Sequence, residues 1–192
     1  MKKSKQNLAF ELWNTHYHEA RLLSVFLFNS KTLTFSDIDN LMAEVISWDL
    51  CDHLCKNLII KLENYEEYIF NWITANHIYK RRAAFTLIAS AAIHDKKIAQ
   101  DTLDLFLKLI SENSNSEHEH IKKAVSWALR EIGKIDFDFN EKALVVAHEL
   151  LKTGNKTQIW IAKDTIKELE NVTKTEGRKR LISVNSKMGQ NL

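Results

Sequence analysis

Trp127 is a large aromatic residue on the polar side of its predicted helix. Within residues 121–134, the apolar residues recur at the spacing of a helix that buries one stripe. At about 100° per residue, Trp127 projects away from that stripe, among Lys123, Arg130 and Lys134. An aromatic ring among cations suits contact with a polyanion that carries rings or sugars. Burial of Trp127 beneath a neighbouring helix is the alternative interpretation.

A second pair of chemically capable residues stands four positions apart. Trp48 and Asp52 lie on one edge of a predicted helix, beside its apolar stripe and next to Lys56. An aspartate at such an edge is usually an N-terminal charge that the helix dipole favours. Asp49 fits that structural role better than Asp52, which lies one turn further into the helix.

Arg82 lies on a helix that is apolar almost all round. The segment 78–89 leaves only a narrow polar strip, where Arg82 stands with Tyr79, Thr86 and Ser90. A guanidinium beside a core helix needs a carboxylate or a phosphate as its partner. A structural salt bridge is the default interpretation, and a phosphate contact is the alternative.

Cys51, His53 and Cys55 lie within one predicted helix and are residue types that could bind a metal. Zinc sites usually take ligands from two separated elements, and the chain holds no second cysteine pair. We therefore interpret both cysteines as small core residues and expect no metal. Two cysteines, with no signal peptide and no run long enough to span a membrane, indicate a reducing cytoplasm.

Composition indicates an all-α protein. The 192 residues include no proline and only 4 glycines, too few turn residues for many strands. The net charge of +2 does not by itself imply nucleic acid. Residues 172–192 hold five cations and one acid, which makes them +4 and leaves −2 for the rest. Such a tail either contacts phosphates or is a solvated terminus.

Apolar periodicity predicts helices almost from end to end. They are expected at 5–13, 17–29, 36–47, 49–61, 64–75, 78–93, 97–112, 118–134, 139–152 and 157–171. Short polar connections predict antiparallel hairpins. The strings that begin at Arg82, Lys123 and Ile161 align at offsets of 41 and 38 residues, a period typical of HEAT and armadillo repeats. We expect one superhelical repeat domain over 1–171 and a flexible basic tail over 172–192.

Four ordered strings resemble the AlkD-like DNA alkylation repair proteins. The resemblance covers about residues 9–170, and its last string is particularly specific. The strings are Glu11-Leu12-Trp13 with His18-Glu19-Ala20-Arg21, Ser47-Trp48-Asp49-Leu50-Cys51-Asp52-His53, Lys80-Arg81-Arg82-Ala83-Ala84-Phe85, and Ala124-Val125-Ser126-Trp127-Ala128-Leu129-Arg130-Glu131-Ile132-Gly133-Lys134.

The resemblance implies a superhelix of HEAT-like helical pairs and a DNA glycosylase that releases N3- and N7-alkylated purines without a cofactor. The family's catalytic aspartate falls on Asp52, its paired aromatics on Trp48 and Trp127, and its phosphate-side arginine on Arg82. The implied partner is double-stranded DNA that carries alkylated purines, bound by a monomer. We assign further DNA contacts to nearby polar residues. These are Lys56, Tyr79, Arg81, Lys123, Arg130 and Lys134.

Two other classes of function stay open. Family members usually carry helices before the Glu11-Leu12-Trp13 string, and their shortage here resembles relatives that bind DNA without excising bases. A non-catalytic DNA-binding solenoid for damaged or branched DNA is therefore the first alternative. The second is a protein-interaction scaffold, the commonest use of such repeats. Binding to random duplex DNA that weakens steeply with salt would separate the DNA binders from the scaffold.

Overall fold

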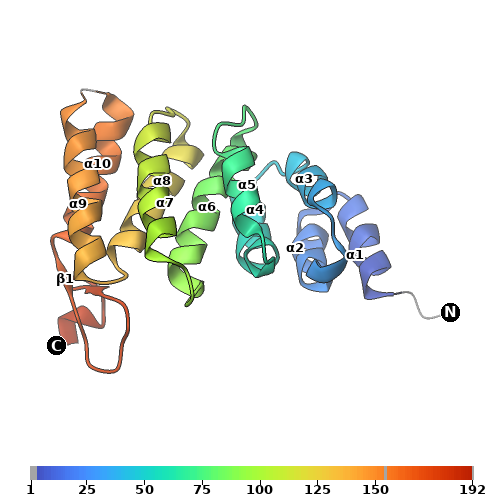
Figure 1. Ribbon diagram of the computed structural model, residues 1–192. Helices are drawn as coiled ribbons and strands as arrows, with labels where there is room; N and C mark the ends of the chain where they lie inside the picture. Colours follow the sequence, from blue (N-terminus) through green and yellow to red (C-terminus); the bar gives the residue numbers. More distant parts are fainter. Residues whose placement is uncertain (1–3, 154, 192) are drawn as a thin grey trace. The chain divides into compact units, whose positions relative to one another are not determined.

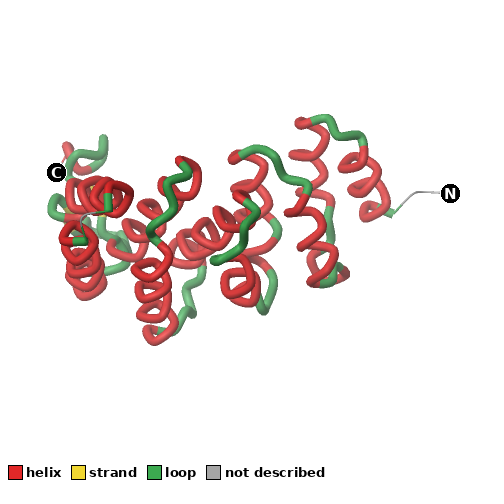
Figure 2. The backbone as a smooth tube through the Cα atoms, turned by 90° about the horizontal axis from the view of Figure 1, so that it is seen from above, coloured by secondary structure: helices red, strands yellow, loops and turns green. Residues whose placement is uncertain are grey.

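The described part of the chain is built almost wholly from α-helices. The computed structural model (Figure 1) describes residues 4–153 and 155–191. Figure 2 shows how little backbone lies outside helices. The helices are α1 (Lys5–Asn14), α2 (His18–Leu27), α3 (Phe35–Ala43), α4 (Trp48–Asn57), α5 (Tyr65–Trp72), α6 (Ile78–His94), α7 (Gln100–Asn113), α8 (Glu119–Gly133), α9 (Phe137–Lys152) and α10 (Lys156–Leu169). Each of the ten predicted helices is therefore confirmed, with ends shifted by a few residues.

The contacts of the chain divide into two compact units, and the single repeat domain expected over 1–171 stays a prediction. The first comprises Met1–Leu87 and the second Ile88–Leu192, so their boundary falls within α6. In a repeat protein each helical hairpin packs mainly against the hairpins next to it in sequence. Few contacts therefore join distant parts of the chain, and the chain divides readily into units. None of the helices in the described residues is long and apolar enough to cross a membrane.

Local polar residues fix where several helices begin. The Thr34 hydroxyl accepts from the Asp37 backbone N–H while the Asp37 carboxylate accepts from the Thr34 N–H, a complete capping box for α3. Asp136 caps α9 by accepting from the Phe139 N–H. These bonds satisfy N–H groups that the first turn of a helix leaves without partners.

Tryptophans join helices within the first unit. Trp13 of α1 is buried and donates its indole N–H to Glu44 at 3.1 Å. Trp72 of α5 is also buried and donates to Asp39 of α3 at 2.8 Å. Both rings fill the core while their one polar atom finds a carboxylate, which avoids the cost of an unsatisfied buried donor.

In the second unit α8, α9 and α10 pack against one another (Figure 1). Gly133 lies where they meet. A Cβ at Gly133 would meet the Leu169 side chain and lie 3.0 Å from Ala143 Cβ, so only glycine fits without a shift. The buried Asn140 donates to the Gly133 and Leu169 carbonyls at 3.2 and 3.1 Å. These bonds satisfy the last carbonyls of two helices at once.

Residues 172–191, where the sequence predicts a flexible basic tail, form a short hairpin of two strands. Strand β1 (Val172–Thr173) pairs antiparallel with β2 (Ile182–Ser183), and a short 3-10 helix follows at Gly189–Asn191. Leu181 is buried, and its N–H donates to the Lys134 carbonyl at 2.9 Å. We call residues 172–191 the C-terminal hairpin.

Candidate functional site

Asp52 and Arg82 form a buried ion pair that joins α4 to α6. Arg82 Nε donates to Asp52 Oδ1 and Nη2 to Asp52 Oδ2, both at 2.9 Å. The two residues, Asp52 and Arg82, are only 8% and 7% exposed. A bidentate pair of this kind fixes both side chains in one orientation. Of the two partners that the sequence left open for Arg82, the structure shows the carboxylate.

Thr86 completes the surroundings of that carboxylate. It lies one turn beyond Arg82 on α6, and its hydroxyl donates to Asp52 Oδ1 at 3.1 Å. The sequence placed Thr86 on the same polar strip as Arg82 but gave no sign of its partner. The turn-by-turn spacing of the two residues puts both donors on the side of α6 that faces Asp52.

Trp48 lies beside the ion pair at the surface. Its ring is 53% exposed, the opposite of the buried Trp13 and Trp72. The Arg82 Cζ stands 5.8 Å from the centre of the Trp48 ring, within range of a cation–π contact. The first unit therefore presents one exposed indole next to a fixed carboxylate and guanidinium. We call Trp48, Asp52, Arg82 and Thr86 the carboxylate cluster.

Electrostatic contacts also hold the start of α4. Asp49 pairs with His18 of α2 at 2.7 Å. Partial burial raises the pKa of Asp49, but its hydrogen bonds, including that from His18, outweigh burial and leave the pKa below its ordinary value. Asp49 thus has the structural role that its place in the first turn predicts.

The cysteines and His53 are structural. Cys51 and Cys55 are buried, and their thiols donate to the Tyr79 and Ala83 carbonyls of α6. Burial raises the pKa of Cys55 well above its ordinary value, which disfavours the thiolate that a metal would need. His53 lies against Leu22 O at 3.1 Å and the Phe26 ring, both on α2. No group of three metal-binding side chains occurs among the described residues.

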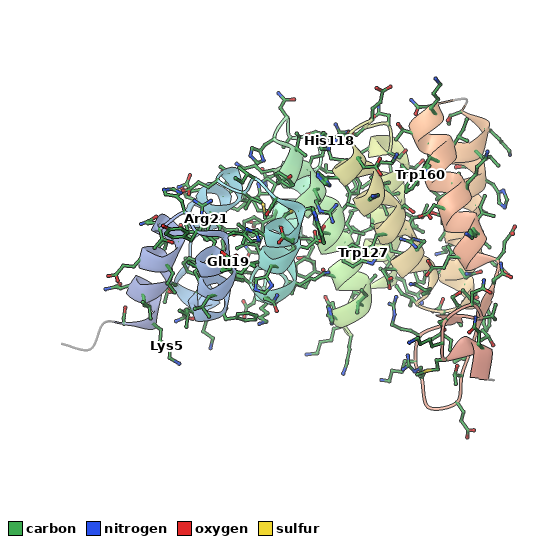
Figure 3. The ribbon with its side chains drawn as sticks, turned by 180° about the vertical axis from the view of Figure 1, so that it is seen from behind. Lys5, Glu19, Arg21, His118, Trp127 and Trp160 are labelled. Carbon is green, nitrogen blue, oxygen red and sulfur yellow. The ribbon has the colours of Figure 1, made fainter. Side chains whose placement is uncertain are left out.

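Trp127 lies on the partly exposed side of α8, as its spacing predicts. The buried residues of α8 form the expected stripe, and Trp127 is outside it. Figure 3 shows Trp127 on α8 and Trp160 on α10, where the Lys122 ammonium covers the Trp160 ring at 4.4 Å. Trp127 belongs to the second unit and the carboxylate cluster to the first.

Acidic residues accompany the cations that flank Trp127. Arg130 pairs with Glu168 of α10 at 2.5 Å, and Lys134 pairs with the same residue at 2.8 Å. Lys123 pairs with Glu119 at 3.1 Å and stays exposed. Arg130 and Lys134 thus bind α8 to α10, and any contact with a phosphate would compete with Glu168.

The remaining predicted DNA contacts lie in the first unit. Lys56 is exposed near the end of α4, while Tyr79 and Arg81 are half-buried on the first turns of α6. Burial raises the pKa of Tyr79, so its hydroxyl stays a hydrogen-bond donor. Their contacts with DNA stay predictions.

The fold and this cluster define a helical-repeat protein, and sequence comparison gives its family. The family model described as DNA alkylation repair enzyme matches residues 1–173. The chain belongs to this family, which confirms the resemblance drawn from its four strings. No curated protein sequence matches the chain.

One solved structure confirms the class of fold. It is described as a new family of proteins related to the HEAT-like repeat DNA glycosylases with affinity for branched DNA structures. The TM-score is 0.67 at 16% sequence identity, over 97% of this chain and 73% of that one. The predicted all-α, HEAT-like repeat fold is therefore confirmed.

Proposed function

We propose that the protein is a DNA glycosylase that releases cationic N3- and N7-alkylated purines from double-stranded DNA. The observation that carries this proposal is the carboxylate cluster, in which an exposed indole stands beside a fixed carboxylate. By the family resemblance, Asp52 would be the catalytic aspartate, Trp48 one of the two aromatics and Arg82 the phosphate-side arginine. The family match over residues 1–173 supports the same interpretation.

Release of a cationic purine needs few catalytic groups. An N7-alkylated guanine is already a cation, so it leaves without a strong general acid. What remains is to stabilise the positive charge that grows on the sugar as the glycosidic bond breaks, and to admit water. The water adds to C1′ of the sugar and loses a proton, which leaves an abasic site. We assign stabilisation of the charge on the sugar to the Asp52 carboxylate, because a preorganised opposite charge is effective where water is largely excluded. The Trp48 face would favour the same cationic centre through its quadrupole.

In this proposal Arg82 is first a positioning residue. Its two hydrogen bonds hold both carboxylate oxygens of Asp52. A phosphate that approached Arg82 would share the guanidinium with Asp52, and Arg82 has five donors to divide between them. Trp127 is the second aromatic that the family resemblance assigns.

A non-catalytic DNA-binding protein is the second candidate. Asp52 is almost fully buried, and both of its oxygens accept hydrogen bonds from Arg82. A carboxylate whose two oxygens are bound in this way could have a purely structural role. The solved relative, described as having affinity for branched DNA structures, makes binding to branched or damaged DNA the specific form of this alternative.

A comparison of base release with DNA affinity tests the assignment of Asp52. We expect Asp52→Asn to lower single-turnover release of 7-methylguanine by about two orders of magnitude or more. Its dissociation constant for the same duplex should stay close to wild type, because one acid near DNA is removed and every phosphate contact is kept.

Asp39→Asn is the matched control. Asp39 also pairs with a cation of α6, Lys80 at 2.7 Å, and accepts from Trp72, but it lies outside the carboxylate cluster. It should destabilise the first unit without lowering base release in the folded protein. Equal losses of release in the two variants, or equal losses of DNA binding and release in Asp52→Asn, would contradict the role given to Asp52.

A further inference from the structure

One arginine, in addition to the backbone bond of Leu181, fixes the C-terminal hairpin to the helices of the second unit. Arg180 donates to the Ala92 carbonyl of α6 and to the Glu131 carbonyl and carboxylate of α8, the latter two at 2.7 and 2.8 Å. Burial lowers the pKa of Arg180, and Glu131 opposes that effect. The charge of Arg180 is thus balanced inside the unit.

The end of the hairpin folds back closely on its second strand. A Cβ at Gly189 would lie 2.7 Å from Val184 Cα, so the chain can approach this near only as glycine. The Val184 N–H donates to the Asn171 carbonyl at 2.8 Å, and the Ser186 hydroxyl donates to Ser183 O at 2.6 Å. These contacts hold the residues that follow the second strand. Between the strands, the Arg178 N–H donates to Thr175 O at 3.1 Å.

The other cations of the hairpin have no such partner. Within the described residues none of the four makes an ion pair, and all are exposed. Glu176 is the one acid of the segment. The four are Lys174, Arg178, Lys179 and Lys187. By contrast, Arg130 of α8 forms an ion pair with Glu168. Lys134, which directly follows α8, forms ion pairs with Glu131 and Glu168.

A hollow lies between the hairpin and the helices of the second unit. It measures about 1120 Å³ and is lined by residues of α6, α8 and the hairpin, with all four unpartnered cations on its walls or rim. Lys96 adds a further cation there. Apolar residues such as Ile135, Phe139 and Ile182 form part of the remaining lining. Four acids also line the hollow, and two of them already pair with cations of the second unit, Glu131 with Arg180 and Glu168 with Lys134. The acids are Asp95, Glu131, Asp136 and Glu168. The hairpin thus presents its charge around a concave surface.

Holding like charges together in a fixed loop is unfavourable by itself. An anion with charges spaced along a chain would relieve the repulsion at several positions, and the DNA backbone is such an anion. The family match ends at residue 173, so all four cations lie outside the segment that carries the carboxylate cluster.

We propose that the C-terminal hairpin is a second DNA-binding surface that contacts backbone phosphates of duplex DNA without reading bases or lesions. The proposal rests on the proposed function, since it takes DNA as the partner. The hairpin would add affinity for DNA of any sequence, while discrimination for damaged purines belongs to the carboxylate cluster.

The test replaces all four unpartnered cations of the hairpin with glutamine. Binding to a short unmodified duplex is measured for the full-length protein from about 50 to about 200 mM salt. We expect the affinity to fall at least about tenfold and the slope of log K against log salt to flatten by about 0.9 for each phosphate that the variant no longer binds. Thermal melting should show an unchanged fold, because the four side chains are exposed.

A control variant carries the same change of charge in the same unit. Lys152, Lys156, Lys163 and Lys167 are exposed on α9 and α10, and their replacement by glutamine should leave the salt slope near that of wild type. Equal slopes for the hairpin and control variants, with wild type binding duplex, would overturn the hairpin proposal alone. Failure of wild type to bind duplex would overturn both it and the proposed function.

Discussion

At the scale of single residues, the Asp52 carboxylate is held by three hydrogen bonds from one helix. Arg82 supplies two and Thr86 the third, and all come from α6. A buried charge pair costs desolvation, and removal of one partner leaves the other uncompensated. Such a pair is costly to keep for stability alone, and its position beside an exposed indole favours a functional reason.

Arg82→Ala should therefore be strongly destabilising. We expect a loss of about 3–5 kcal/mol in the free energy of unfolding, since the buried Asp52 carboxylate would lose its partner. Urea denaturation measures this directly. The double variant Arg82→Met with Asp52→Leu should recover most of the loss, because no charge is then left buried. A mild effect of Arg82→Ala, or no recovery in the double variant, would show that the pair is solvated.

Trp48→Ala should separate function from stability. Trp48 is 53% exposed and contacts Arg82 only at cation–π distance, so its loss should cost no more than about 1 kcal/mol. Base release should fall clearly in the same variant if the ring lies against the reacting sugar. Trp13→Ala is the contrast, because Trp13 is buried and its removal should cost about 3–5 kcal/mol. A large loss of stability in Trp48→Ala would argue for a structural ring.

Sequence reasoning at this scale identified residue types better than partners. The helical spacing correctly placed Trp127 off the buried stripe of α8 and both cysteines in the core. It required a partner for Arg82 but could not choose Asp52, because a pair 30 residues apart in sequence depends on how α4 and α6 pack. The functional roles that sequence reasoning assigned to the site residues stay predictions.

At the scale of elements, successive repeats are tied by equivalent positions. Ser126 donates to Asp164 and Arg130 pairs with Glu168, each across 38 residues. Lys142 pairs with Asp104 across the same interval. This is the offset at which the strings beginning at Lys123 and Ile161 align. The faint sequence repeat thus has a physical counterpart in polar contacts between neighbouring hairpins.

Gly133→Val should disrupt the junction of α8, α9 and α10. Its side chain would overlap Leu169 and crowd Ala143, both of them buried. Overpacking of this kind costs about 1–3 kcal/mol, measurable as a lower melting temperature. Gly177→Ala, on the hairpin, is a control without steric overlap, since nothing lies within 4 Å of its Cβ, though its φ of +77° carries some strain. An unchanged melting temperature in Gly133→Val would show that the junction has room for a side chain.

The hairpin is the element whose strands sequence reasoning did not predict. Its strands are two residues each, too short for the alternation that predicts a strand. Its order depends on Arg180 and Leu181 reaching groups on α6 and α8, contacts far apart in sequence. The helices were predictable because their apolar stripes and caps are local signals.

At the scale of the whole molecule, ion pairs make the free energy of unfolding depend on pH. Burial raises the pKa of Glu168, but Lys134 and Arg130 outweigh it and leave the pKa below its ordinary value of 4.5. The pKa of Asp39 is lowered in the same way, against burial, by Lys80 and Trp72. A carboxylate with a depressed folded pKa stabilises the protein above its unfolded pKa, and that stability is lost as pH falls through the folded value.

Stability should therefore fall as the pH decreases from about 5. Urea denaturation at several pH values measures the slope, and Glu168→Gln should flatten it while lowering stability at neutral pH. The effect of Glu168→Gln should shrink as the pH falls, because wild-type Glu168 is then protonated too. An undiminished effect at low pH would show that shape rather than charge gives Glu168 its role.

The most direct test of the central claim is the product made by the wild-type protein. Protein in excess over a duplex with one 7-methylguanine should release the free base and leave an abasic site, faster than the spontaneous rate. The Asp52→Asn variant should release the base no faster than the spontaneous rate while it still binds the duplex. No release above the spontaneous rate, from protein that is folded and bound to DNA, would contradict a glycosylase and leave a DNA-binding protein whose carboxylate cluster is structural.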